Sequence, residues 1–332
     1  MLNPTICQWD LTPVCNLNCK HCRIREREFK PLDHSDLLCL ADKLAISTVT
    51  SLAIAGGEPL AYPKLGDIMA HIGGINHIMI LTNGTLINRD TVKLLKQYRC
   101  DVQVSLDGGT EHTHDTCRGK GSFAKSVNGI GLLRDNKIPF WTRLTIMPSN
   151  KNEVFDFVIM SKSLGANACS IRRCVPVGNA SNLEQLSVDE IKLAFGEAYR
   201  AGKKVKIKIV SPDPFAMIYY DQTKKEQCER LMSKYPQTCI GGCKSGLTSF
   251  YIDPSGKVIF CPYAPIYCGD LLKDNLDVIW RESKTLQYAR KIRHNLHGKC
   301  ASCKYLMVCG GCPAVSFAVT GSILQSDRDC WL

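Results

Sequence analysis

The 332-residue sequence lacks any apolar run approaching the ~18 residues that a membrane span needs. Residues 1–9 lack the basic segment and apolar core of a secretory signal peptide. No long low-complexity tract and no internal repeat is visible, which argues against a disordered chain or a solenoid. We therefore predict a globular protein with no membrane association that works in the cytoplasm.

Acidic residues are also few, because 31 Asp and Glu face 42 Lys and Arg, which gives a formal net charge of +11. Such an excess favours an acidic partner but does not indicate nucleic acid, which we do not predict. What the chain has in abundance is cysteine, with 19 residues. An odd number of thiols in a large chain without an export signal argues against a disulfide framework and indicates metal or redox chemistry.

Short apolar runs alternate with helical patterns over residues 1–175, and the runs end in polar residues or glycine. This alternation predicts an α/β fold, a partial (β/α)6 TIM-like barrel, with its chemistry at the carboxyl ends of the strands. The predicted strands are Ile6–Leu11, Ser51–Ala55, His77–Thr82, Asp101–Ser105, Phe140–Ile146 and Ala168–Arg173. The predicted helices are Asp33–Ala45, Leu65–His71, Asp90–Gln97, Ser122–Asn136 and Asn152–Leu164.

Two further parts follow the barrel. We interpret residues 176–238 as a bridging region, and residues 239–332 as a small Cys-rich α+β domain. In the bridging region the patterns predict a helix at Ser187–Ala201, a strand at Lys203–Val210 and a helix at Pro214–Met232. In the Cys-rich domain, Tyr251–Phe260 predicts a hairpin because two β-type runs flank a Pro-Ser-Gly turn.

Cys15, Cys19 and Cys22 form a Cys-x3-Cys-x2-Cys array after the first predicted strand. Three thiolates leave one iron of a 4Fe–4S cluster open to a substrate or cofactor. The alternative is a structural zinc whose fourth ligand comes from elsewhere, such as His21 or His34.

The array resembles the signature of the radical S-adenosylmethionine (radical SAM) superfamily. Further motifs agree in order along the chain: Gly56-Gly57-Glu58-Pro59, Thr82-Asn83-Gly84, Ser105-Leu106-Asp107-Gly108 and His114-Asp115-x2-Arg118-Gly119. The resemblance implies an oxidoreductase that cleaves SAM reductively to a 5′-deoxyadenosyl radical, which then takes a hydrogen atom from the substrate. Electron delivery would need a flavodoxin-type or ferredoxin-type reductant.

The same resemblance implies the residues of the site. Cys15, Cys19 and Cys22 would hold the catalytic 4Fe–4S cluster. The SAM-binding residues would be His21, Gly56, Gly57, Glu58, Pro59, Asn83, Ser105, Arg118 and Arg172. Glu58 would accept hydrogen bonds from the SAM ammonium, and Arg172 belongs to an Arg-x2-Pro-x-Gly-like segment ending at Gly178. Ser105 as a strand-end cap, Arg118 and Arg172 as structural ion-pair partners, and Cys117 as either a hydrogen-atom donor or a core thiol remain open.

The C-terminal cysteines resemble the SPASM domain, which carries two auxiliary 4Fe–4S clusters, so three clusters are expected in total. The resemblance implies that one auxiliary cluster is held by Cys300, Cys303, Cys309 and Cys330. The other would be held by Cys243, Cys261 and Cys312, with Cys239 as the simplest fourth ligand. Cys228, Cys268 or a site open to substrate are the alternatives, and two structural zinc sites are the alternative to clusters.

Two substrate classes compete. The Cys309-x2-Cys312 spacing resembles a subgroup with mycofactocin maturases and alternative haem-pathway enzymes, and we predict maturation of a ribosomally made peptide by oxidation, crosslinking or decarboxylation. The alternative is an acidic small molecule such as a carboxylated tetrapyrrole. Seven Lys or Arg against one acid in Arg281–Lys304 suit an acidic ligand, leader peptide or reductant, or a solvated helix face.

Two further observations bear on the substrate, and one alternative function remains. Pro262 stands where sulfatase-maturing relatives carry an Asp, which argues against that role. We expect no extra domain before the first strand that would bind a leader peptide, and we therefore expect a partner or the bridging region to recruit a peptide. A non-catalytic iron–sulfur electron-transfer protein is the reading from another class, and it predicts no 5′-deoxyadenosine.

Overall fold

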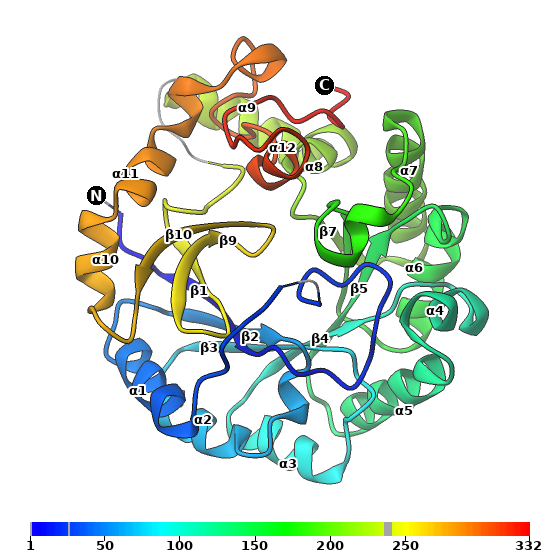
Figure 1. The fold of residues 1–332 in the computed structure, drawn as a ribbon. Helices are drawn as coiled ribbons and strands as arrows, with labels where there is room; N and C mark the ends of the chain where they lie inside the picture. Colours follow the sequence, from blue (N-terminus) through cyan, green and yellow to red (C-terminus); the bar gives the residue numbers. More distant parts are fainter. Residues whose placement is uncertain (1, 26, 236–240) are drawn as a thin grey trace.

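The computed structural model describes residues 2–25, 27–235 and 241–332. A ten-stranded sheet in the order β10-β9-β8-β1-β2-β3-β4-β5-β6-β7 curves around the centre, with helices outside it (Figure 1). Its strands are β1 Ile6–Thr12, β2 Ser51–Gly56, β3 His77–Thr82, β4 Asp101–Ser105, β5 Phe140–Ile146, β6 Ala168–Arg173, β7 Lys208–Val210, β8 Ser249–Ile252, β9 Lys257–Cys261 and β10 Ala264–Asp270.

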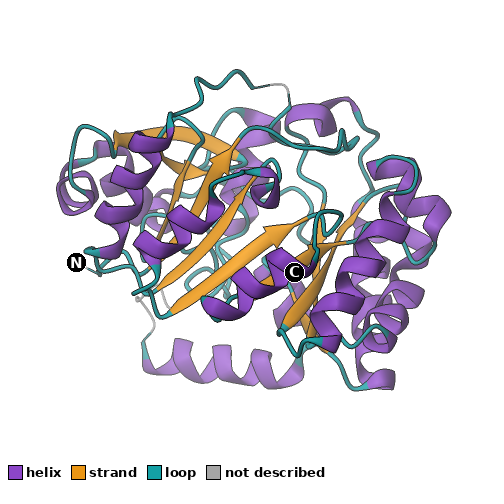
Figure 2. Ribbon diagram, turned by 90° about the horizontal axis from the view of Figure 1, so that it is seen from below, coloured by secondary structure: helices purple, strands orange, loops and turns teal. Residues whose placement is uncertain are grey.

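Strands β1 to β7 pair in parallel, as expected for right-handed βα units, and the predicted α/β barrel is confirmed. Helices cover the outer face of the sheet, and Figure 2 shows them on the flanks of the strands. The helices are α1 His34–Ala45, α2 Leu65–Ile72, α3 Arg89–Gln97, α4 Glu111–Arg118, α5 Ser122–Asp135, α6 Val154–Ser163, α7 Val188–Val205, α8 Pro214–Tyr220, α9 Gln222–Lys234, α10 Leu276–Glu282, α11 Lys284–Arg290 and α12 Pro313–Thr320.

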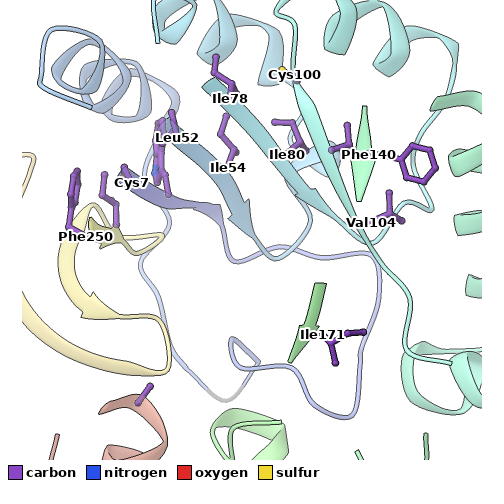
Figure 3. Packing of buried hydrophobic residues seen from close by; sticks show 14 of the residues in the cluster. Cys7, Leu52, Ile54, Ile78, Ile80, Cys100, Val104, Phe140, Ile171 and Phe250 are labelled. Carbon is purple, nitrogen blue, oxygen red and sulfur yellow. The ribbon is translucent and has the colours of Figure 1, made fainter. Parts of the chain in front are cut away.

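The strands are apolar toward the helices, and several are polar toward the barrel interior, because successive side chains of a strand point to opposite faces. On β4, Val102 and Val104 join the buried hydrophobic cluster, whereas Gln103 and Ser105 line an internal cavity. Figure 3 shows Ile54, Ile80 and Phe140 among the buried side chains between strands and helices. The core therefore lies outside the barrel and leaves its interior for chemistry.

The barrel differs from the prediction at α4, a helix that the sequence analysis did not predict because its sequence has no hydrophobic stripe. Its buried residues are Thr113, His114, Cys117 and Arg118, so its buried face is largely polar and a search for apolar periodicity misses it. The hydroxyl of Thr110 caps its first turn by accepting from the backbone N–H of Thr113.

The bridging region also differs in detail. The strand predicted over Lys203–Val210 shortens to β7, because α7 continues to Val205 and ends at Lys206 in the left-handed conformation. The helix predicted over Pro214–Met232 is broken into α8 and α9 at Asp221, whose side chain caps α9.

The Cys-rich segment does not form a separate sheet. Strand β8 pairs in parallel with β1, with Phe250 opposite Cys7, and β9 and β10 continue antiparallel from it. The predicted hairpin forms from β8 and β9, with Asp253 accepting from the N–H groups of Ser255 and Lys257 in the turn. In the described part of the chain, no helix is both long and apolar enough to cross a membrane.

Candidate active site

A cavity of about 200 Å³ lies at the carboxyl ends of the barrel strands. The segment between β1 and α1, which carries the first cysteine array, crosses the mouth of the barrel and forms one wall (Figure 1). The predicted site residues that line this cavity are Cys15, Cys19, His21, Cys22, Gly56, Gly57, Asn83, Ser105, Arg118 and Arg172. Glu58 and Pro59 do not line it.

Gly56 and Gly57 hold the cysteine loop against the end of β2. Gly56 has a φ of +125°, and a Cβ on Gly57 would lie 2.2 Å from the carbonyl oxygen of Val14. The N–H of Gly57 donates to Thr12 O, and that of Glu58 to Val14 O. The glycines are therefore required because the backbone leading into the cysteine array passes directly over them.

Glu58 is fully buried and bonded to the protein. Its carboxylate accepts from the Thr82 hydroxyl and the Asn83 N–H, each at 2.7 Å, and from the Leu60 N–H at 3.0 Å. Burial raises the pKa of Glu58, and these hydrogen bonds oppose that rise. In this structure Glu58 positions Asn83, whose side-chain amide lies 3.9 Å from Cys15 Sγ.

The thiols of the first array converge on the cavity and are provided with donors. The Leu17 N–H lies 3.4 Å from Cys15 Sγ, and Arg118 Nη1 lies 3.9 Å from Cys19 Sγ. Burial raises the pKa of Cys19 to about 11, and the Arg118 charge opposes that rise. Three thiols with N–H donors and a cation beside them suit a cluster that carries negative charge, so the residues fit a three-cysteine 4Fe–4S site.

The segment that follows β6 also holds the first cysteine array in place through Gly178 and Asn179. The N–H of Asn179 donates to Cys22 O at 2.9 Å, and its side chain donates to Cys19 O at 3.0 Å. Gly178 has a φ of +58°, and a Cβ there would lie 2.5 Å from the Cys22 carbonyl oxygen. The glycine of the Arg-x2-Pro-x-Gly-like segment therefore allows close packing on the cysteine loop.

His21 and Arg118 share one buried carboxylate. Arg118 Nε donates to Asp107 at 2.6 Å, and His21 Nε2 lies 3.4 Å from the same carboxylate. His21 Nδ1 lies 3.1 Å from Cys117 Sγ, and burial lowers the pKa of His21 to about 4. Donor atoms of His21, Asp107 and Cys117 lie within 4.8 Å of one another, but Asp107 is already paired with Arg118. Cys117 does not line the cavity.

Arginines dominate the charge of the cavity, and they differ in their partners. Arg23 makes two hydrogen bonds to Asp10, at 2.7 and 2.8 Å, and Arg173 pairs with three aspartates behind the wall. Arg143 instead donates to the Gln103 side-chain oxygen at 3.1 Å, and the Arg172 guanidinium lies 3.6 Å from the centre of the Tyr263 ring. Within residues 2–25, 27–235 and 241–332, neither Arg143 nor Arg172 has an acidic ion-pair partner.

Sequence reasoning missed several lining residues: Gln8, Gln103, Arg143, Thr145 and Tyr263. A signal existed for Gln8, Gln103 and Thr145, because each is a polar residue between two apolar neighbours on a strand, whereas Arg143 follows the polar Thr142. Tyr263 follows Cys261 by two positions and reaches the cavity only because β8 to β10 extend the barrel sheet.

The C-terminal cysteines form two neighbouring groups. Burial, and then the neighbouring thiol of Cys243, raise the pKa of Cys261 to about 11. Burial also raises the pKa of Cys309, with Cys330 adding to the rise, and Cys330 in turn is influenced by Cys300. The full ligand sets implied by the resemblance, which also include Cys303 and Cys312, stay a prediction.

The buried side chain of Arg293 links the chain segments that carry these cysteines. Its guanidinium donates to the carbonyl oxygens of Gly241, Met307 and Cys309, and no carboxylate in the described part of the chain pairs with it. N–H groups of Gly311 and Tyr305 lie 3.4 Å from Cys309 Sγ and Cys303 Sγ respectively. A buried cation and N–H donors around thiols fit an anionic cluster at this place.

The fourth ligand of the other auxiliary cluster stays a prediction. Cys239 lies outside the described residues. Cys268 is buried, and burial alone raises its pKa to about 12, whereas Cys228 has Lys224 and Glu229 as its charged neighbours. Among the described residues, neither thiol is influenced by a cluster cysteine.

Some basic side chains of the segment Arg281–Lys304 bind backbone carbonyl oxygens, and others are exposed to solvent. Arg290 donates to the carbonyl oxygens of Trp280 and Gly246, and Lys299 donates to that of Cys330. Lys284, Lys291 and Lys304 remain exposed. Part of the positive charge therefore stabilises the Cys-rich domain, and only the rest is available to an acidic partner.

Comparison with known proteins agrees with this fold and site. Residues 9–158 match the Radical SAM superfamily, and residues 243–304 match SPASM, an iron–sulfur cluster-binding domain. The chain is 30% identical over 339 residues to the AdoMet-dependent heme synthase of Methanosarcina barkeri, covering 98% of this chain and 96% of that protein. The chain therefore belongs to the radical SAM enzymes with a C-terminal SPASM domain, as the motifs predicted.

Other relatives span nearly the whole chain. Mycofactocin maturase MftC of Mycobacterium ulcerans is 28% identical over 356 residues, covering 99% of this chain and 88% of that protein. The solved structure of Streptococcus suis SuiB bound to S-adenosylmethionine has a TM-score of 0.79 at 16% identity, covering 99% of this chain and 78% of that one. This likeness shows that the two proteins share a fold.

Proposed function

We propose that this radical SAM enzyme oxidises a substrate bound in the cavity between the cysteine loop and the Cys-rich domain. The observation that carries the proposal is Tyr263, which lines the same cavity as Cys15, Cys19 and Cys22 and follows the auxiliary-cluster residue Cys261 by two positions. A substrate in this cavity adjoins both kinds of iron–sulfur site. When bound, the clusters and SAM supply a 5′-deoxyadenosyl radical and an acceptor for the electron that the substrate radical releases.

The chain's own residues would bind the cofactors, orient the substrate and exclude water from the cavity. The array Cys15, Cys19 and Cys22 would hold the catalytic cluster, and Asn83, Ser105, Gly56 and Gly57, which line the same cavity, would contact SAM. Glu58 positions Asn83, and Asp107 fixes the Arg118 guanidinium beside Cys19. The loop over the mouth limits solvent access, which protects a radical from side reactions.

Two substrate classes have support. A peptide is supported by the mycofactocin maturase relative and by SuiB, which has also been solved with its precursor peptide SuiA. A haem precursor is supported by the heme synthase relatives of Methanosarcina barkeri and Oleidesulfovibrio alaskensis. The unpaired arginines of the cavity add weight to the acidic haem precursor.

The test begins with SAM cleavage. The full chain, reconstituted anaerobically with iron and sulfide, should form 5′-deoxyadenosine from SAM when dithionite is added. The triple variant Cys15→Ala/Cys19→Ala/Cys22→Ala should form none, whereas Cys39→Ala, at an exposed thiol on α1, should behave as the wild type. Equal product from the triple variant and the wild type would refute the proposal.

Substrate and partner need a second experiment. Deuterated candidate peptides and deuterated haem precursors are offered separately, and transfer of deuterium into 5′-deoxyadenosine identifies the substrate class. Replacing dithionite by a flavodoxin or ferredoxin tests the reductant. We expect an acidic reductant to act more slowly at high salt, because the exposed lysines near Cys303 are screened.

A further inference from the structure

Arg143 lies inside the barrel at the centre of β5 (Phe140–Ile146), half-buried and without an acidic ion-pair partner in the described chain. In the strand register it stands opposite Ser105 of β4, and Arg172 of β6 stands opposite Thr145, two residues beyond Arg143 on β5. The two guanidinium groups therefore enter the cavity from neighbouring strands.

Their surroundings leave positive charge uncompensated. Burial lowers the pKa of Arg143, and the charges of Arg172 and Arg23 add to this effect, whereas Tyr263 and the more distant Asp107 oppose it. The pKa of Arg172 is raised instead, because Tyr263, Cys312, Asp213 and Cys261 outweigh its burial. Other arginines of the cavity have their charge matched, Arg23 by Asp10 and Arg118 by Asp107. Two cations held together in a half-buried site are costly unless a bound anion offsets them.

The expected cofactors do not remove this surplus. A 4Fe–4S cluster with three thiolates carries a charge of about −1 when oxidised. SAM carries about +1, because its sulfonium and ammonium outweigh its carboxylate. The two charges sum to about zero. Arg172 also faces the auxiliary-cluster residues Cys261 and Cys312, whereas Arg143 has no cluster cysteine among its charged neighbours in the described chain. The positive charge of Arg143 is therefore the one that the expected cofactors leave without an anionic neighbour.

We propose that Arg143 and Arg172, with the side chain of Gln103, form a site for a carboxylate of the substrate. Guanidinium groups bind carboxylates through paired, charge-assisted hydrogen bonds, so the site would fix an acidic side chain relative to the reacting carbon. This rests on the proposed function and adds the substrate class to it. The carboxylate belongs either to a tetrapyrrole side chain or to an acidic peptide residue, and the experiment separates these sources.

Binding is measured on the full chain, reconstituted anaerobically and saturated with SAM. One probe pair is a tetracarboxylated porphyrin and its tetramethyl ester. The other is a capped tetrapeptide with two adjacent glutamates and its glutamine counterpart. We expect the acidic member of one pair to bind at least about tenfold more tightly than its neutral member, and that pair identifies the source.

Variants then assign the effect to the arginines. Arg143→Gln should remove the preference for the acidic probe, Arg143→Lys should keep part of it, and Arg172→Gln should weaken it. Arg200→Gln, at an exposed arginine on α7 paired with Glu197, should leave it unchanged.

The proposal is overturned if neither acidic probe binds more tightly than its neutral counterpart. It is also overturned if Arg143→Gln retains the full preference, or if SAM affinity falls by the same factor as probe affinity, since the arginines would then hold SAM. Failure of the proposed function would instead be seen as absent 5′-deoxyadenosine in the wild type, a separate measurement.

Discussion

Arg173 on β6 donates from Nη1 to Oδ1 of Asp327 at 2.8 Å, and both side chains are almost completely buried. The bond joins the barrel wall to the segment that carries Cys330. Asp327 also accepts from the Cys312 N–H at 2.9 Å, so one carboxylate holds the barrel and a cluster-ligand loop together.

Replacing Arg173 by Met should destabilise the protein strongly. It would leave Asp213, Asp327 and Asp329 buried near one another without their shared cation. Breaking such a buried network costs about 3–5 kcal/mol of unfolding free energy. Denaturant unfolding and the iron content per chain measure the effect. Arg134→Met, at an exposed pair with Asp135, should cost less than about 1 kcal/mol, and an equal loss in the two variants would contradict the prediction.

Gly57→Ala should displace the cysteine loop, because the new Cβ would lie 2.2 Å from the Val14 carbonyl oxygen. We expect a loss of about 1–3 kcal/mol in stability and less iron bound at the first array. Gly74→Ala is the matched control, since a Cβ there meets nothing within 4 Å. Iron analysis and thermal unfolding of both variants measure the loss of iron and of stability. A Gly57→Ala protein with full iron content would contradict the prediction, because the loop could then move without losing the cluster.

Arg293→Met should release the auxiliary-cluster segments from one another. The carbonyl oxygens of Gly241, Met307 and Cys309 would lose a shared donor in a buried place. An unmet buried acceptor costs about 1–3 kcal/mol. We expect fewer iron atoms per chain and a weakened auxiliary-cluster signal in electron paramagnetic resonance. Arg281→Met, at an exposed arginine on α10, should keep both, and unchanged spectra in Arg293→Met would remove Arg293 from this role.

His114 should make the protein less stable as pH falls from about 6.5 to about 4. Burial lowers its pKa to about 4, with the Arg118 charge adding to the effect. Its Nδ1 accepts from the Asp107 N–H, and its Nε2 has no partner in the described chain. Between these pH values the unfolded chain binds a proton that the folded chain does not, so unfolding is favoured by up to about 3 kcal/mol.

The measurement compares the free energy of unfolding at pH 7 and at pH 4.5. His114→Asn keeps an acceptor for the Asp107 N–H and should show a smaller loss of stability than the wild type. His112→Asn, on the exposed side of the same helix, should lose as much as the wild type. The same loss in His114→Asn as in the wild type would assign the acid sensitivity to other groups.

The predicted barrel strands match the structure closely because their signal is local. Phe140–Ile146 and Ala168–Arg173 have the predicted bounds, since both are short segments in which alternate residues join the hydrophobic core. Helix α4 escaped detection because its buried face is formed by Thr113, His114, Cys117 and Arg118, which pack on Asp107 and Phe123 rather than on an apolar core.

The sequence by itself indicated a metal or cluster site at the first array, because three cysteines within eight residues can reach one centre, and the further motifs favoured an iron–sulfur cluster over zinc. Tertiary structure decided which charges remain free. Arg143 lies in the middle of β5 and Arg173 at the end of β6, and neither position shows in the sequence whether an acidic residue lies near it. Only the fold brings Asp213, Asp327 and Asp329 to Arg173 and leaves Arg143 facing the cavity with Gln103. The physical reason is that an ion pair depends on distance in space, and these partners are 40 to 156 residues from Arg173 along the chain.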